Sequence, residues 1–476
     1  MNRNNLWIRI TIVAIVISFA AVLGQIQRWR SDLRPATVQV TVNDEHKKPK
    51  RPKRPKSENE PEVLVKFKSG VTNERVRDIA SRSNDRIEDE IESVNGLYAI
   101  DDLDNADVES VAAQYAAMSD LVDYAEPNLE IRLDEQEMEY VGKQLVIRED
   151  PVGSPNDPQF GDQWALNNLG GDGGKKRADI DALQAWLATK GSKKVVVAVL
   201  DSGVDYTHKD LVSNMWIRPD SLPQYTDGQL GTFDDRNGFD AVAEIADPMD
   251  DNGHGTHCAG VIGAEGNNGI GIAGINWEVQ IMPLKFLGRS GFGSTKNAIE
   301  AINYAIDRKK KGVNVRIISA SWGSTSRSKA LGDAIKAAGD AGILFVAAAG
   351  NASTDNDKRP HYPSNYDLPN VVSVAALDRA DNLASFSNYG AKTVHIAAPG
   401  KDIISTWLND DFRGASGTSM ATPHVAGVAA LILAKSPNLS VEKLRERLFN
   451  SVDKLDSLSG KVSSGGRLNA AKALSK

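Results

Sequence analysis

Two kinds of hydrophobic pattern alternate in the C-terminal part of the chain. Continuous apolar runs, of which VVVAVL at Val195–Leu200 is the clearest, alternate with segments whose apolar residues have helical spacing. The other runs lie at 316–322, 343–350, 370–377 and 393–398, and the helical segments at 294–311 and 328–342. Apolar runs without polar interruption are typical of parallel strands covered on both faces. Residues 156–476 are therefore expected to form an α/β domain with a parallel sheet flanked by helices.

A shorter stretch, residues 61–133, has a different pattern. EVLVKFK at 62–68 alternates apolar and polar residues like a half-buried strand, and TNERVRDIASRS at 72–83 predicts an amphipathic helix. A second strand, a second helix and a closing strand region are expected at 95–100, 107–118 and 121–133. These elements predict a small α+β domain. Residues 134–155 have no clear periodicity and are expected to be a connecting segment.

The residues before this small domain are expected to serve export and spacing. Two arginines precede an apolar run, Ile10 to Leu23, which fits the hydrophobic region of a signal peptide ending at about residue 24. An uncleaved membrane anchor is the alternative. We expect the protein to be secreted, or membrane-anchored if residues 1–24 are not removed. Cations and prolines alternate in the stretch HKKPKRPKRPK, which predicts that residues 25–60 form an extended basic linker.

The composition excludes some functions and indicates a source of stability. The formal net charge is −7, whereas proteins that bind nucleic acids usually carry a basic excess, so no nucleic-acid partner is expected. One cysteine excludes an internal disulfide, so an exported form needs a sufficient core or another stiffening group. We expect a monomer.

The stretch NGHGTHCAG contains His254, His257 and the chain's only cysteine, Cys258. Imidazole and thiolate groups at such close spacing are ligands that zinc prefers. The alternative is that one of the two histidines is a catalytic base. These residues alone leave both hypotheses open.

Four polar residues follow predicted strands or begin apolar helical segments. They are Asp201 after VVVAVL, Asn351 after ILFVAAAG, and His254 and Ser419 at helix starts. Chemistry in parallel sheets collects at the carboxyl ends of the strands, so we expect these side chains to meet. A serine hydroxyl becomes a nucleophile when an imidazole accepts its proton, and a buried carboxylate orients that imidazole. Amide donors at a helix N-terminus stabilise the oxyanion.

Several sequence blocks carry a resemblance to a known family. AVLDSGVDYTHKDL, NGHGTHCAGVIG, SASWG, AAAGN and GTSMATPHVAG resemble the signature blocks of the subtilisin-like serine proteases, in that family's order. The resemblance covers about residues 156–474. It implies that Asp201 orients the imidazole, that His254 is the base, that Ser419 attacks and that Asn351 completes the oxyanion hole. It also makes His257 a packing residue, which disfavours zinc.

The resemblance further implies where a polypeptide substrate binds. In the family, the substrate pairs as an extended strand between two chain segments. The matching segments are Gly291, Phe292 and Gly293 on one side and Ser321, Trp322 and Gly323 on the other. Ala348, Gly350 and the second segment would wall the first specificity pocket, and their small size predicts a preference for large apolar P1 residues. His361 aligns with the pocket floor, with an ordinary loop histidine as the alternative.

Calcium is the expected replacement for disulfides. GNNGIGIAG, at 266–274, resembles the high-affinity calcium loop of the family, with a plain Gly/Asn turn as the alternative. The implied ligands are the side chains of Asp157, Asp210 and Asn268 and the carbonyl groups of Gly266, Ile270 and Ile272. Hard oxygen ligands from several segments fit Ca²⁺.

Residues 61–133 resemble the inhibitor-type propeptide of these proteases, most clearly in DYAEPN, and the resemblance implies a ferredoxin-like fold for this α+β domain. The resemblance implies a self-processing zymogen: a serine endopeptidase of broad specificity on polypeptide substrates, inhibited by its own propeptide until it cuts itself between residues 133 and 157. A protease-like binding scaffold is the rival class, and the intact catalytic set argues against it. A nucleotide-binding domain is disfavoured because DSGVDY, and not a GxGxxG or P-loop, comes directly after the first strand of the α/β domain.

Overall fold

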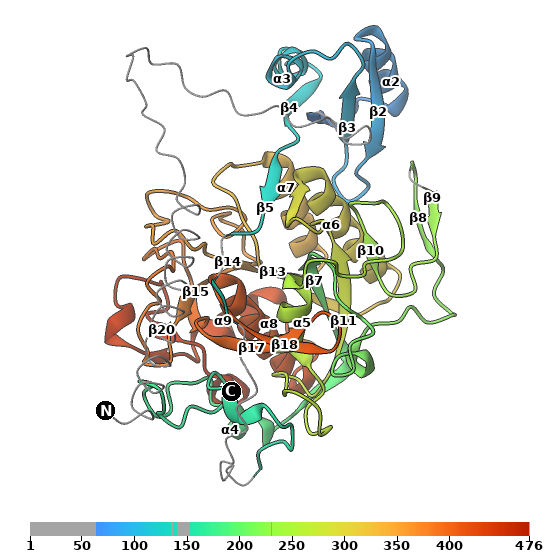
Figure 1. The fold of residues 1–476 in the computed structure, drawn as a ribbon. Coiled ribbons are helices and arrows are strands. Elements are labelled where there is room, and N and C mark those ends of the chain that lie inside the picture. The colour runs from blue at the N-terminus through green and yellow to red at the C-terminus, as the bar shows by residue number, and fades with distance from the viewer. Residues whose placement is uncertain (1–62, 135–136, 140–152, 230, 476) are drawn as a thin grey trace, which may run out of the picture. The chain divides into compact units, whose positions relative to one another are not determined.

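The computed structural model describes residues 63–134, 137–139, 153–229 and 231–475. The predicted signal or anchor segment, the basic linker and most of the connecting segment lie outside these residues. Among the described residues, no helix has both the length and the apolar character needed to cross a membrane. The described chain forms a large α/β sheet domain and a small α+β domain (Figure 1).

A nine-stranded sheet is the centre of the larger domain. Its order is β10-β11-β7-β13-β14-β15-β16-β20-β19, and all neighbours are parallel except β19 and β20. The strands are β7 (Gly191–Asp201), β10 (Phe239–Asp240), β11 (Glu278–Lys285), β13 (Val315–Ala320), β14 (Leu344–Ala348), β15 (Val371–Leu377), β16 (Ile396–Pro399), β19 (Asp453–Lys454) and β20 (Gly466–Arg467). Each predicted apolar run is a strand, which confirms the predicted α/β fold.

Helices cover both faces of the sheet because successive side chains of each strand point to opposite faces. In β7, Val197 packs into one hydrophobic core and the next residue, Ala198, into the other. The first core also contains α5 (His254–Gly263) and α8 (Thr418–Lys435), and the second α6 (Thr295–Lys310) and α7 (Lys329–Asp340) (Figure 1). The helices predicted at 294–311 and 328–342 are confirmed.

The small domain has the βαββαβ order of a ferredoxin-like fold. Its antiparallel sheet has the order β2-β3-β1-β4. The elements are β1 (Val63–Phe67), α2 (Asn73–Arg82), β2 (Asp85–Glu90), β3 (Leu97–Asp102), α3 (Val108–Ala116) and β4 (Val122–Pro127). Strand β2 was not expected from the sequence, because DRIEDE carries five charged residues and a single apolar one.

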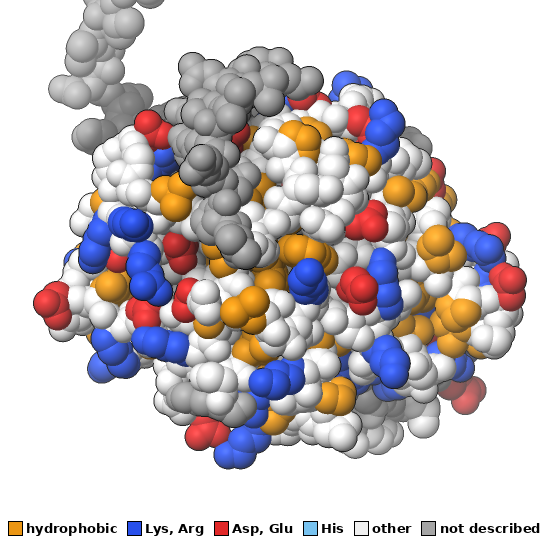
Figure 2. Space-filling model, turned by 90° about the horizontal axis from the view of Figure 1, so that it is seen from below, with side chains coloured by type: hydrophobic (Ala, Val, Ile, Leu, Met, Phe, Trp, Pro, Cys, Tyr) orange, Lys and Arg blue, Asp and Glu red, His pale blue; other side chains and the backbone are white. Residues whose placement is uncertain are grey.

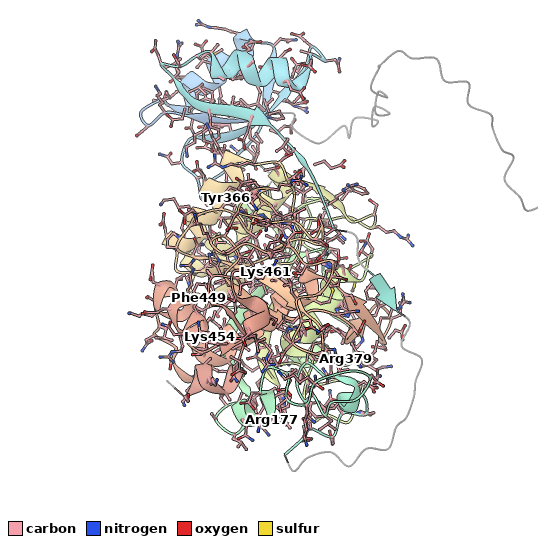
Figure 3. All side chains as sticks on the ribbon, turned by 90° about the vertical axis from the view of Figure 1, so that its left-hand side faces the viewer. Arg177, Tyr366, Arg379, Phe449, Lys454 and Lys461 are labelled. Atoms are coloured by element: carbon pink, nitrogen blue, oxygen red, sulfur yellow. The ribbon has the colours of Figure 1, made fainter. Side chains whose placement is uncertain are left out.

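Shorter elements complete the described chain. They are β5 (Glu130–Arg132), β6 (Glu137–Glu139), η1 (Phe160–Asp162), α4 (Ala182–Trp186), η2 (Val212–Asn214), β8 (Tyr225–Asp227), β9 (Gly231–Phe233), β12 (Phe292–Ser294), β17 (Ile403–Trp407), β18 (Asp411–Ser416), α9 (Val441–Phe449), η3 (Asp456–Leu458) and α10 (Ala470–Leu474). Phe449 of α9, which is labelled in Figure 3, stacks on His395, with ring centroids 5.3 Å apart. On the face in Figure 2, acidic and basic side chains are interspersed with small apolar areas.

Candidate active site

The end of β7 and the start of α5 bring an acid and an imidazole together. Asp201 is the last residue of β7 and His254 the first of α5, and Oδ1 of Asp201 lies 2.6 Å from Nδ1 of His254. The exposed fraction is 0% for Asp201 and 3% for His254. Asp201 also accepts a 2.8 Å hydrogen bond from the amide of Ser202, which fixes its carboxylate. This is the arrangement that holds an imidazole in one tautomer.

Asp250, which the sequence analysis did not single out, fixes the start of α5. Its carboxylate accepts hydrogen bonds from the amides of Gly253 and Thr256 at 2.9 and 3.0 Å. It also accepts a 2.9 Å bond from the hydroxyl of Ser202, beside Asp201. An acidic side chain at a helix N-terminus satisfies free amides there. The run MDDNGH carries this capping signal in the sequence.

The charges around His254 raise its pKa. Burial by itself lowers the pKa, but the negative charge of Asp201 and its hydrogen bond outweigh burial, and Asp250 and Asp134 add to them. The positive form of the ring is thus stabilised where a base must accept a proton. The effect of Asp134 is notable because this residue belongs to the segment that follows the small domain.

Ser419 and Asn351 meet at the N-terminus of α8. Ser419 is the second residue of this helix, where the backbone amides have no acceptor within the helix. The side-chain oxygen of Asn351 accepts bonds from the amide and the hydroxyl of Thr418, both at 2.8 Å. These two hydrogen bonds hold the Asn351 side chain beside the serine. Donors at such a helix start suit a developing oxyanion.

The Ser419 hydroxyl is engaged with the backbone in the structure. It donates to the carbonyl of Ser321 at 3.0 Å, while the Ser321 hydroxyl donates to the carbonyl of Ser419 at 2.8 Å. Nε2 of His254 is buried and has no hydrogen-bond partner among the described residues. Transfer of the serine proton to His254 therefore requires the hydroxyl to leave its backbone acceptor.

The other histidine and the cysteine of NGHGTHCAG are packing residues. Nε2 of His257 lies 3.0 and 3.1 Å from the carbonyl oxygens of Ile403 and Arg413. Burial, together with the charge on His254, lowers the pKa of His257 to about 3, so its ring is neutral. The buried thiol of Cys258 has a pKa well above its ordinary value, again because of burial. Ligand atoms of Cys258, His254 and Asp201 lie within 4.8 Å of one another, and His257 is not part of that group.

A strand from the end of the small domain occupies the predicted substrate cleft. β5 pairs antiparallel with β12, so that Arg132 lies opposite Phe292 and Ile131 opposite Gly293. On its other side, Arg132 forms an antiparallel bridge with Gly323. The two segments predicted to bind substrate thus pair with one extended chain, as in strand addition.

The remaining predicted pocket residues come from several elements of the peptidase domain. The amide of Leu133 donates to the carbonyl of Gly291 at 3.0 Å. Trp322 contributes only backbone, because its side chain is fully buried and its Nε1 donates to the carbonyl of Leu200 at 2.9 Å. Ala348 ends β14, and the amide of Gly350 donates to the hydroxyl of Thr418. Nε2 of His361 lies 3.4 Å from Oδ2 of Asp134.

The predicted calcium loop brings carboxylates and an amide side chain together. Asp210 accepts bonds from Nδ2 of Asn268 at 2.8 Å and from the amide of Ile272 at 3.0 Å. Asp157 accepts bonds from the amides of Asn267 and Asn268. Burial raises the pKa of Asp210 to about 7, and the charge of Asp157 contributes.

The two carboxylates of this set suit Ca²⁺, whereas Asn268 turns its Nδ2 toward Asp210 and its Oδ1 accepts a bond from the amide of Ile270. Two buried carboxylates near one another destabilise each other's ionised form, and a divalent cation removes that penalty. The carbonyl groups of Gly266 and Ile270 belong to the same loop, but for Ile272 the contact with Asp210 is made by the amide.

A model of the subtilase family, peptidase S8, matches residues 192–466, and a model of the fervidolysin N-terminal prodomain matches residues 54–128. This chain belongs to the subtilase family. It is a serine endopeptidase of the subtilisin type with an N-terminal prodomain. The small α+β domain is that prodomain, as the resemblance implied.

Relatives of this subtilase match different shares of the chain. It is 32% identical to "Thermophilic serine proteinase" of Bacillus sp. (strain AK1) over 96% of this chain and 100% of the relative. Thermitase of Thermoactinomyces vulgaris is 37% identical over 67% of this chain and 99% of thermitase. The crystal structure of fervidolysin from Fervidobacterium pennivorans, 24% identical, superposes with a TM-score of 0.69 over 88% of this chain and 61% of that one. The last comparison supports the fold.

The prodomain of this subtilase also caps two helices of the peptidase domain. The carboxylate of Glu126 accepts bonds from the amides of Lys329 and Ala330, at 2.9 and 3.0 Å, at the start of α7. Asn128 accepts a 2.9 Å bond from the amide of Lys296 at the start of α6. These residues lie in the DYAEPN motif, so the motif has a physical role as a pair of helix caps.

Proposed function

We propose that this subtilase hydrolyses peptide bonds through an acyl-enzyme on Ser419. His254 accepts the serine proton during attack and later donates it to the leaving amine. Asp201 orients the imidazole and stabilises its positive form, and Asn351 donates to the oxyanion together with the start of α8. The 2.6 Å contact between Asp201 and His254, beside the start of α8, is the observation that carries this proposal.

The chain is a zymogen that processes itself. The last strand of the prodomain, β5, pairs on both sides with the segments predicted to hold substrate. A bound segment of this kind blocks other polypeptides and presents its own peptide bond to the serine. The boundaries that we assign are residues 61–133 for the inhibitory prodomain and 134–155 for the connection that is cut. The prodomain is an intramolecular inhibitor until this cut, and afterwards it inhibits as a bound, separate chain until it is released.

Export and calcium complete the proposal. Relatives such as the "Minor extracellular protease Epr" of Bacillus subtilis are extracellular by name, which supports secretion directed by residues 1–24. Residues 25–60 then act as a spacer before the prodomain. Asp157, Asp210 and Asn268 hold one structural Ca²⁺, which ties the loop at 266–274 to two other chain segments. The mature enzyme acts as a monomer.

Labelling with a fluorophosphonate probe tests the assignment of the nucleophile. The processed wild type should react at Ser419 and hydrolyse casein, and Ser419→Ala should do neither while keeping its circular dichroism spectrum. Ser326→Ala, at an exposed position close to the cleft, serves as the matched control and should react like the wild type. Equal labelling of Ser419→Ala would refute the assignment, and a folded wild type without labelling would favour a non-catalytic scaffold.

A further inference from the structure

Asp134, which follows β5 in the predicted substrate cleft, lies against His361. Arg132 is paired on both sides, and Asp134 follows it by two residues, so both side chains point to the same face of the extended strand. Oδ2 of Asp134 lies 3.4 Å from Nε2 of His361, within the distance of an ion pair. The negative charge of Asp134 also contributes to the raised pKa of His254.

His361 fills the space between the walls of the first specificity pocket. A Cβ added to Gly323 would lie 2.0 Å from Cε1 of His361, and one added to Gly350 would lie 3.0 Å from its Cδ2. The ring therefore lies between the strand segment ending at Gly323 and the segment after β14. Only glycine at these two positions leaves room for an imidazole. The pocket is thus shaped around a polar floor and offers less space to a large apolar side chain than the sequence suggested.

The ring nitrogens of His361 can still form hydrogen bonds with a ligand. The residue is 6% exposed, and neither ring nitrogen has a hydrogen-bond partner among the described residues. A buried polar group without a partner costs free energy, which a carboxylate in the pocket would recover. Asp134 is the group that faces it.

The loop that carries His361 is held firmly in place. The amide of His361 donates to Oδ1 of Asn365 at 3.1 Å, and its carbonyl accepts a 2.7 Å bond from the hydroxyl of Ser364. The next residue pairs with Ser324 at the end of the substrate-binding segment. Farther along, the Tyr366 hydroxyl donates to the carbonyl of Ser328 (Figure 3). A fixed loop of this kind can discriminate between side chains, because the ring is preorganised.

We propose that the first specificity pocket selects an acidic P1 side chain through His361, and that self-processing cuts the bond between Asp134 and Glu135. This proposal rests on the proposed function and replaces the apolar P1 preference expected from the sequence. Neutral imidazole donates an N–H to the carboxylate, and the protonated ring forms an ion pair with it. An apolar side chain would leave the buried nitrogens of His361 without a partner.

The cleavage step uses only groups already named. Ser419 Oγ attacks the carbonyl carbon of Asp134, and its proton passes to His254. The C–N bond to Glu135 breaks as His254 returns this proton to the new amino group. Water then hydrolyses the ester between Ser419 and Asp134, which leaves Asp134 as the C-terminus of the released prodomain.

Fluorogenic peptides that differ only at P1 test the selectivity. The series carries the chain's own sequence, Leu-Glu-Ile-Arg-Leu, followed by Asp, Asn or Leu and a fluorogenic amide, and the mature wild-type enzyme is the catalyst. We expect kcat/KM for the Asp peptide to exceed that for the Asn and Leu peptides by about tenfold or more, as for a charge-assisted hydrogen bond. In His361→Ala, the advantage of Asp over Asn should disappear and Leu should become the preferred residue.

The precursor supplies an independent readout and a matched control. Asp134→Asn should slow self-processing, whereas Asp123→Asn, at an exposed position of the same prodomain, should process at the wild-type rate. The amino terminus of the mature enzyme should be Glu135.

Fluorophosphonate labelling counts active sites in every sample and separates the two proposals. A labelled wild type that prefers the Leu peptide, or a mature amino terminus elsewhere, overturns the selectivity. A folded wild type that neither labels nor cleaves any peptide overturns the proposed function itself.

Discussion

Nδ1 of His254 lies 2.6 Å from Oδ1 of Asp201, and both side chains are almost completely buried. The contact joins the end of the central strand β7 to the start of α5. Burial opposes a positive ring and the carboxylate favours it, and the carboxylate prevails, so the pKa of His254 is raised. The position of this pKa decides over which pH range the base is neutral and the enzyme active.

Substitution of Asp201 by asparagine should lower activity and shift its pH dependence. We expect kcat to fall by about 10⁴-fold, because the imidazole loses its tautomer and its charge partner. The base must be neutral, so the wild-type rate rises as pH passes through the raised pKa of His254. Without the Asp201 charge, burial lowers that pKa, and the rising limb of kcat/KM should move to lower pH. Asp220→Asn, at an exposed position, should leave the limb unchanged.

Removal of calcium should destabilise the protein. At a cation concentration of 100 times Kd, binding contributes about 2.7 kcal/mol, which corresponds to a fall in Tm of roughly 5–10 °C in excess EDTA. Asp210→Asn should melt at that lower temperature with or without Ca²⁺, whereas the exposed Asp172→Asn should behave like the wild type. Because the pKa of Asp210 is raised to about 7 without the cation, protection by calcium should decline as pH falls below 7. A Tm insensitive to EDTA would contradict the site.

Loss of the Glu126 carboxylate should weaken the hold of the prodomain. Glu126→Gln removes a negative charge from the start of α7. That charge and the two hydrogen bonds from backbone amides contribute about 0.5–2 kcal/mol to binding of the prodomain. Activity should therefore appear sooner after self-processing. The nearby exposed substitution Asp123→Asn provides the control, and identical lag times in the two variants would argue against the cap.

Release of the prodomain should become faster as pH rises through 7. Burial raises the pKa of Asp89 to about 7, and the charges of Asp227 and Glu92 contribute, although Glu300 and Lys296 oppose the rise. Asp89 is completely buried in the complex, so its pKa is higher there than in a released prodomain. The complex of prodomain and peptidase domain therefore binds more protons than the separated domains. The stability that protonated Asp89 contributes to the complex is full at low pH and is lost as pH rises through 7.

The lag before activity at pH 6 and pH 8 measures this effect. The wild type should show a shorter lag at pH 8, and Asp89→Asn should reduce the difference between the two pH values. Asp120→Asn, at an exposed position of the prodomain, should keep the wild-type difference. An equal pH difference in Asp89→Asn would assign the dependence to another group.

Local patterns in the sequence predicted the sheet and the meeting of Asp201 with His254. An uninterrupted apolar run ends at Asp201, and parallel strands bring their carboxyl ends to one edge of the sheet. The local sequence pattern is therefore enough to predict that Asp201 lies near other residues of this edge. Strand β2 escaped prediction, because five of its six residues are charged and its pairing depends on β3. The raised pKa of Asp89, in the same strand, could not be predicted either, because residues of α6, far away in sequence, surround its side chain.

The contact of Asp134 with His361 lies beyond any local pattern. These residues are far apart in sequence, and neither lies in an element with a periodic signal. Their approach depends on the register of β5 against β12, which is set only when the prodomain docks. The same holds for Glu126, whose role as a cap requires a helix from the other domain.

The intact mass of the purified precursor, measured beside that of Ser419→Ala after incubation with calcium, decides whether the chain cuts itself through Ser419. We expect only the wild type to shorten, with a new amino terminus between residues 133 and 157. Catalysis, the nucleophile and the zymogen organisation would then be established together. Processing of purified Ser419→Ala to the same product would contradict the account, because another group or enzyme would have cut the chain.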